Sequence, residues 1–198
     1  MVEKATDNKL YFLSIALLCI LTYLLNCCTL IYQCALAFII IAITMNATTS
    51  VYGKSKALRG LAFAIAISFV LLWELPYYID GKMINGIVVA SFTSLMISMY
   101  WSAFVFQKLS SKFSAMASNA LSFAAGTIID GLIMGLFFIA NNNFSYEKIL
   151  DIFMKECSYK LTYGLVASVI LAIALNMLKK NPNLKVKMAM EKFYVTAK

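Results

Sequence analysis

Six long apolar runs dominate this 198-residue chain and restrict what it can fold into. A helix needs about 20 apolar residues to cross the hydrocarbon core of a bilayer. With 62% hydrophobic and 13% charged residues, the chain has more apolar surface than a soluble domain of its length can bury. We therefore expect an all-α, polytopic membrane protein with a single transmembrane domain over residues 1–198. The six predicted transmembrane helices span residues 10–25, 30–49, 60–78, 85–107, 113–140 and 159–178.

The basic residues between the apolar runs predict the orientation of the chain. Lysine and arginine gather before the first run and after the second, fourth and sixth, whereas the loop after the first run is uncharged. The positive-inside rule then places both termini in the cytoplasm, including the lysine-rich tail over residues 181–198. Because these cations flank apolar runs, the net charge of +8 suggests membrane lipids and not nucleic acid as their partner.

The segment over residues 145–156 lies in the only sizeable outer loop that this arrangement predicts. Ser145 is a suitable helix cap, and Ile149, Ile152 and Phe153 repeat at helical spacing opposite a charged face. We expect a short amphipathic helix on the outer interface. It serves either as a lid over a site or as a simple connector.

Asp130 is the only formal charge in the apolar stretch 119–140. A carboxylate near the bilayer centre costs about 2.5–3.5 kcal/mol on insertion scales, so it usually faces a bundle interior and serves a site. Gly131 and Gly135 form a GxxxG pair, and Gly126 adds a small residue before them. We expect these glycines to pack the helix tightly against a neighbour. The alternative is that Asp130 is a structural acid, held by a buried ion pair or by hydrogen bonds.

Other polar residues lie near the ends of the predicted helices. Glu156 and Lys160 share a helix face, where they form either an i,i+4 ion pair or, with Tyr159, the outer mouth of a cavity. Asn46 either lies among lipid headgroups or points inward toward the hydrogen-bonding edge of a ligand. For Asn26 we favour the wet surroundings of a helix end.

The chain lacks the residue patterns of common enzymes and metal sites. It has no histidine, and its five cysteines show no metal-ligand spacing. It also lacks HExxH, Walker A and GxGxxG motifs. We therefore expect no enzymatic activity, no catalytic residue, no metal and no cofactor. The cysteines are expected to be small apolar residues inside helices, with a disulfide unsupported by the sequence.

Four segments resemble the queuosine-precursor transporter family, also called the vitamin-uptake-transporter family. They are MNATTSVYGKSKALRG (45–60), ASFTSLMISMYWSAFVFQKL (90–109), GTIIDGLIMGLFFIA (126–140) and ECSYKLTYGLVASVILAIALNMLKK (156–180). The residues that match the family pattern are Asn26, Asn46, Thr48, Tyr52, Gly53, Arg59, Asp130, Glu156, Tyr159 and Lys160. Thr127 takes the place of an amide one turn before the acid, and Met99 and Ser102 stand where the fourth helix of the family usually carries Gln and Asp.

The resemblance implies a six-helix fold similar to the substrate-binding subunits of energy-coupling-factor transporters, working without the energising module. It implies a secondary transporter that imports queuine or related deazaguanine bases across the bacterial inner membrane for tRNA modification. Such a purine-like base offers N–H groups to a carboxylate and a carbonyl to an amide or a lysine. The substrate-binding residues on this basis are Asp130, Glu156, Lys160, Asn46, Thr127, Tyr159, Asn26 and Tyr52. Tyr52, Tyr100 and Trp101 are the candidates for stacking on the base.

Two other functions stay open at this stage. A vitamin-type binding subunit would dock on a separate ATP-driven module. A structural membrane protein would use Asp130 only to hold two helices together. The choice between a monomer and a homo-oligomer also stays open.

Overall fold

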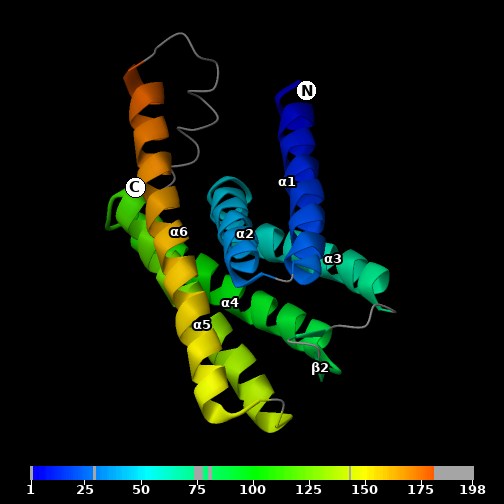
Figure 1. The fold of residues 1–198 in the computed structure, drawn as a ribbon. Coiled ribbons are helices and arrows are strands. Elements are labelled where there is room, and N and C mark those ends of the chain that lie inside the picture. The colour runs from blue at the N-terminus through cyan, green and yellow to red at the C-terminus, as the bar shows by residue number, and fades with distance from the viewer. Residues whose placement is uncertain (1, 29, 74–77, 80–81, 143, 181–198) are drawn as a thin grey trace.

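The computed structural model describes residues 2–28, 30–73, 78–79, 82–142 and 144–180 (Figure 1). Its helices are α1 (Val2–Cys27), α2 (Ile31–Tyr52), α3 (Lys54–Leu72), α4 (Ile87–Ser110), α5 (Ala115–Ala140) and α6 (Tyr146–Lys180). Two short antiparallel strands, β1 (Tyr78–Ile79) and β2 (Lys82–Met83), lie between α3 and α4. Each of the six helices is long and apolar enough to cross a membrane, which favours a multi-pass membrane protein. The expected helical fold with six such helices is confirmed.

Helix α2 is the central helix of the bundle, because it contacts all five of the others. Its sequence is apolar on every side, as expected of a helix that is surrounded by protein. The main core gathers around its side chains Phe38, Ile41 and Met45, together with residues from its neighbours such as Leu61 and Leu95. Many large apolar side chains on the outer surface are exposed instead, and this surface suits lipid and not water.

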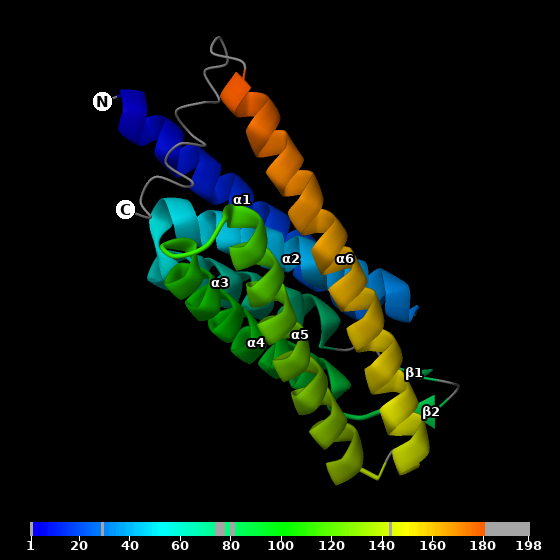
Figure 2. The ribbon, with the colours of Figure 1, turned by 90° about the vertical axis from the view of Figure 1, so that its left-hand side faces the viewer.

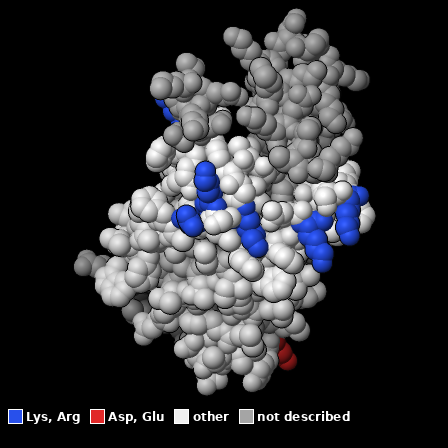
Figure 3. Space-filling model, turned by 180° about the vertical axis from the view of Figure 1, so that it is seen from behind, with Lys and Arg blue, Asp and Glu red and all other residues white. Residues whose placement is uncertain are grey.

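Successive helices run up and down the bundle, so alternate connections gather at the same end. The start of α1 and the end of α6 lie at one end, and the α5–α6 turn and the β1–β2 hairpin lie at the other (Figure 2). We call these the terminal end and the hairpin end. Basic residues at the start of α3 and the end of α4, among them Lys54 and Lys108, belong to the terminal end. Figure 3 shows a band of lysine and arginine on one face, well separated from the acidic side chain near the opposite end.

Helix α3 differs from its predicted bounds at both ends. It begins at Lys54, so the basic stretch expected to be a loop forms its first turns. Gly53 alone separates it from α2, and its φ of 83° lies in the left-handed region that glycine adopts most readily. The helix ends at Leu72, whereas the predicted end at residue 78 lies beyond a stretch, 74–77, outside the described residues. The basic residues were expected to form a loop because they are charged, but lysine and arginine are also good helix formers.

Helix α6 runs without interruption from Tyr146 to Lys180, so the expectation of a separate short helix over 145–156 is wrong. The predicted cap is present, because Ser145 Oγ accepts a hydrogen bond from Lys148 N at 3.4 Å. The first glycine after this cap is Gly164, and no proline precedes it within the helix, so nothing in the local sequence stops the helix. The predicted cytoplasmic tail, residues 181–198, lies outside the described residues.

Candidate functional site

Asp130 lies in the interior of the bundle, where α5 meets α4 and α6, and is 6% exposed. One of its carboxylate oxygens pairs with Lys160 Nζ of α6. The other accepts a hydrogen bond of 2.6 Å from Ser94 Oγ of α4. The same hydroxyl lies 3.0 Å from the backbone oxygen of Asp130. The carboxylate therefore joins three helices.

Lys160 is 2% exposed and pairs with two carboxylates, those of Asp130 and Glu156. Its ammonium group also lies 4.2 Å from the centre of the Phe38 ring on α2, close enough for a cation–π contact. We call Asp130, Glu156 and Lys160 the charged triad. The ion pair and the hydrogen bond expected of a structural acid are both present at Asp130, whereas its service to a site stays a prediction.

The charged triad is electrostatically unbalanced. Ionised in full, it has two negative charges and one positive charge in a place where water is largely excluded. Burying an ion costs several kcal/mol even after relaxation, so an uncompensated charge there attracts a proton, a cation or an N–H-rich ligand. The Glu156 side chain is 21% exposed, against 8% for Asp130, and it is the more accessible carboxylate.

Glycines set the close approach of the helices around the triad. A Cβ atom added at Gly131 would lie 2.6 Å from the Phe153 ring, so α6 packs directly onto the α5 backbone there. One added at Gly126 would lie 3.2 Å from Ser102 Cβ of α4. A Cβ at Gly135 would meet nothing within 4 Å, which corrects the expectation that the whole GxxxG pair packs against a neighbour. Only its first glycine has this role.

Asn46 points inward, as one of its two readings predicted, but it belongs to a second cluster. Its Nδ2 donates to Asn119 Oδ1 at 3.0 Å and to Ser122 Oγ at 2.8 Å. We call these three residues the amide cluster. Asn119 and Ser122 precede Asp130 by eleven and eight residues on α5. At 1.5 Å per residue this separates the two clusters by roughly 12–17 Å along the helix. Asn46 therefore does not lie beside the triad, although both were predicted to bind the same substrate.

Four other predicted site residues take no part in the ion pairs of the charged triad. Asn26 is 8% exposed, so it is more buried than was expected of a wet helix end. Its amide donates a hydrogen bond to Thr22 O of its own helix at 3.2 Å. Tyr159 is 42% exposed and stacks on Tyr163. Tyr52 makes an edge contact with Tyr11, with ring centres 5.1 Å apart.

Thr127 is the fourth of these residues, and it is fully buried one turn before Asp130. Its hydroxyl has no hydrogen-bond partner among the described residues. Among the predicted site residues, Asn46 Oδ1 is likewise a buried polar atom without a partner in the described part of the chain.

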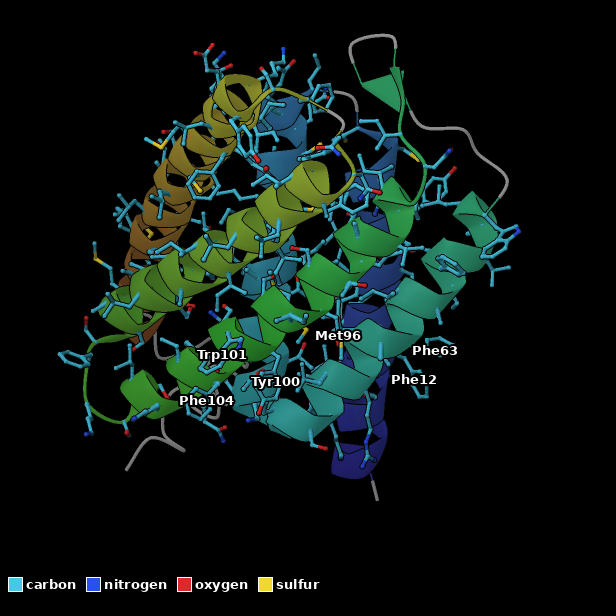
Figure 4. All side chains as sticks on the ribbon, turned by 90° about the horizontal axis from the view of Figure 1, so that it is seen from below. Phe12, Phe63, Met96, Tyr100, Trp101 and Phe104 are labelled. Carbon is cyan, nitrogen blue, oxygen red and sulfur yellow. The ribbon has the colours of Figure 1, made fainter. Side chains whose placement is uncertain are left out.

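Two of the three aromatic residues proposed to stack on a base, Tyr100 and Trp101, lie on the outer side of α4. Tyr100 and Trp101 are 43% and 45% exposed, and Trp101 contacts Phe104 edge-on. Figure 4 shows these three side chains along α4, near its terminal end. Lys54 Nζ lies 4.7 Å from the Tyr100 ring centre. The structure therefore groups them with the basic residues and not with the charged triad.

Sequence reasoning missed several partners of the predicted residues. Ser94 binds Asp130, and Asn119 and Ser122 bind Asn46. The signal for Ser94 was a spacing: Ser94, Ser98 and Ser102 recur every four residues and therefore lie along one side of α4. Of the two departures from the family pattern, Met99 is in the main core and Ser102 packs on Gly126.

The structure offers no evident metal centre within the residues that it describes. There, no three or more histidine, cysteine, aspartate or glutamate side chains gather in a way that could hold an ion. All five cysteines are free thiols. Comparisons of the chain with protein-family models, with curated proteins and with solved structures found no match.

Proposed function

We propose that this protein is a secondary transporter that imports queuosine precursors, queuine or related deazaguanine bases, across the bacterial inner membrane for tRNA modification. The charged triad, buried where α4, α5 and α6 meet, is the observation that carries the proposal. Intramembrane ionisable groups generally mark substrate or ion pathways. The four segments that resemble the queuosine-precursor transporters include all three members of the triad. We also propose that the bundle has the architecture of energy-coupling-factor binding subunits.

The three charged groups have different parts in this proposal. Both oxygens of Asp130 are already engaged, by Lys160 and by Ser94, so Asp130 positions the lysine. Glu156 is the more exposed acid and accepts N–H groups of the base. Lys160 donates to the carbonyl of the base when it exchanges one carboxylate partner for the ligand. Such an exchange changes the contact between α5 and α6, which is the helix motion that alternating access requires.

The test is a complementation assay in cells that cannot synthesise the base. Expression of the protein with external queuine, or with either of its cyano and aminomethyl precursors, is expected to restore queuosine in tRNA. The variant Glu156→Gln is expected to abolish the gain, because a neutral amide neither pairs with Lys160 nor attracts a donor-rich base. Asp151→Asn is the matched control, an exposed acid on the same helix that pairs with Lys155. Absence of modified tRNA with wild-type protein present in the membrane would refute the proposal.

The proposed orientation has both termini in the cytoplasm. It is supported by the basic residues that gather at the terminal end of the bundle, such as Lys56, Arg59 and Lys112. A C-terminal fusion to a reporter that fluoresces only in the cytoplasm is expected to be bright, and a fusion to a phosphatase that works only outside is expected to be inactive. The reverse pattern would overturn the orientation.

A structural function is the second candidate, and one contact favours it: the Asp130 carboxylate is saturated by protein groups. Asp130→Asn distinguishes the candidates, because it removes one charge of the pair and leaves Lys160 paired with Glu156. If the pair only holds α5 to α6, the variant is destabilised and uptake per folded molecule is unchanged. If the pair serves a ligand, the variant reaches the membrane at normal levels but uptake is lost.

A further inference from the structure

A row of small and polar residues extends along one face of α5 from the amide cluster to the triad. Asn119, Ser122, Gly126 and Asp130 are spaced by three, four and four residues, which places them on the same side of a helix. We call these four residues the polar stripe. At 1.5 Å per residue it covers roughly 16 Å, about half of a bilayer core of about 30 Å.

Polar side chains from two other helices face the polar stripe at three levels. At the triad, Ser94 of α4 binds Asp130. At the next level, Ser102 of α4 packs on Gly126. At the level nearest the terminal end, Asn46 of α2 binds both Asn119 and Ser122. The polar stripe therefore has polar neighbours from both α2 and α4.

Several buried polar atoms on α2, α4 and α5 have no hydrogen-bond partner within the described residues. They are Asn46 Oδ1, Thr49 Oγ1, Ser102 Oγ, Ser118 Oγ and Thr127 Oγ1. Each of these side chains is at most 5% exposed, and all belong to α2, α4 or α5. A buried polar group without a partner destabilises a fold, so five of them on three adjoining helices require an explanation.

Other hydroxyls on the same helices do find partners, because they donate to backbone oxygens of the preceding turn. On α2, Thr44 and Thr48 donate to the backbone oxygens four residues earlier, at 2.8 and 2.7 Å, whereas Thr49 does not. On α4, Ser98 donates to Leu95 O at 3.0 Å, whereas Ser102 does not. Buried groups of this kind usually bind ordered water.

The hairpin end of the bundle is different, because apolar residues lie beyond the triad there. Ile84, Phe138 and Ile149 form a second core cluster, with Phe137 and Met134 packed against it. This cluster joins the start of α4, the end of α5 and the start of α6. Polar groups therefore extend from the triad toward the terminal end, whereas an apolar cluster lies between α4, α5 and α6 near the hairpin end.

We propose that the polar stripe is a water path that connects the charged triad with solution at the terminal end of the bundle. Water donates to Asn46 Oδ1 and bonds the unpaired hydroxyls, and it gives the unbalanced triad access to protons. In the proposed orientation this is the cytoplasmic side, so water reaches the triad from the cytoplasm. This inference deepens the proposed transport function by naming the side from which its site is hydrated.

Cysteine accessibility tests the path. Ser102→Cys and Thr127→Cys are made separately in the full chain with its five native cysteines replaced, and each position keeps a similar side-chain volume. Membrane vesicles of either orientation are treated with a small, charged, membrane-impermeant thiol reagent. Both cysteines are expected to react when the terminal end faces the reagent and to be protected when the hairpin end does.

Two control positions define what an inaccessible cysteine does. Ala42→Cys lies in the apolar core at 0% exposure, and Ile128→Cys lies on the outer side of α5 at 50% exposure, where lipid excludes a charged reagent. The Ser102→Cys and Thr127→Cys variants are expected to react at least an order of magnitude faster than both controls. Rates equal to these controls, or reaction from the hairpin end alone, overturn the proposal. Because labelling does not require uptake, a labelled protein without transport refutes only the transport function, and transport without labelling refutes only the path.

Discussion

Lys160 of α6 forms a buried ion pair with Asp130 of α5, and the two residues are thirty positions apart in the chain. The same ammonium group also pairs with Glu156, one turn earlier on its own helix. One cation thus pairs with an acid on the neighbouring helix and with an acid on its own helix. The α5–α6 contact therefore depends on a single buried lysine.

Removal of the Lys160 charge is predicted to lower the free energy of unfolding more than removal of the Asp130 charge. Lys160→Met leaves Asp130 and Glu156 without their shared partner, and removal of one partner from a buried pair costs about 3–5 kcal/mol. Asp130→Asn leaves Lys160 paired with Glu156 and retains a group that accepts from Ser94. Denaturant unfolding in detergent is therefore expected to show a clearly lower free energy for Lys160→Met. Equal losses in the two variants would mean that the lysine is not the centre of the cluster.

The two glycines of the GxxxG pair are predicted to respond differently to alanine. Gly131→Ala introduces a Cβ 2.6 Å from the Phe153 ring and 3.3 Å from Cys157 Sγ. Overpacking of this kind costs about 1–3 kcal/mol, so the melting temperature is expected to fall. Gly135→Ala is the matched control, where nothing lies within 4 Å and alanine favours the helix by about 1 kcal/mol. A fall of equal size in both variants contradicts the packing described for α5 and α6.

A hydrogen bond between α1 and α3 is predicted to contribute little, although it is buried. Thr22 Oγ1 and Ser68 Oγ lie 2.7 Å apart, and both residues are 0% exposed. Interhelical hydrogen bonds in membrane proteins average about 0.6 kcal/mol and reach about 1.7 kcal/mol. A double-mutant cycle of Thr22→Val and Ser68→Ala is expected to give a coupling energy within that range. Thr22 also donates to Leu18 O at 2.8 Å, so the single Thr22 variant alone does not isolate the contact.

The continuity of α6 is open to a proline test. Ser158 lies at the position where the sequence suggested a break between two helices, and its side chain is exposed. Ser158→Pro is expected to destabilise the protein by about 3 kcal/mol, because proline removes a helical hydrogen bond and clashes with the preceding turn. Tyr146→Pro, at the first helical position, is expected to be tolerated. Helical content and thermal unfolding measure both effects, and a neutral Ser158→Pro would point to two separate helices.

The sequence alone predicted six membrane-length helices, because a bilayer demands long apolar runs wherever they occur in a fold. It also identified Asp130 and the i,i+4 pair of Glu156 and Lys160, since an intramembrane charge and a helical spacing are both local properties. Helix ends were less certain. Lys54 begins α3 within a basic stretch that was expected to be a loop. Helix α6 continues from Tyr146 past residue 156, because no glycine or proline interrupts it there.

The tertiary structure decided which of these local features meet. Asp130 contacts Ser94 and Lys160 because α4, α5 and α6 pack side by side, and the partner of a polar group depends on the rotation of each helix about its axis. The same rotations place Asn46 against Asn119 and Ser122, away from the triad. Apolar runs carry little information about rotation, because lipid and apolar protein surface are similar environments for the same side chains. The helices could therefore be predicted from the sequence, whereas the pairing of their few polar groups depends on how the helices pack in three dimensions.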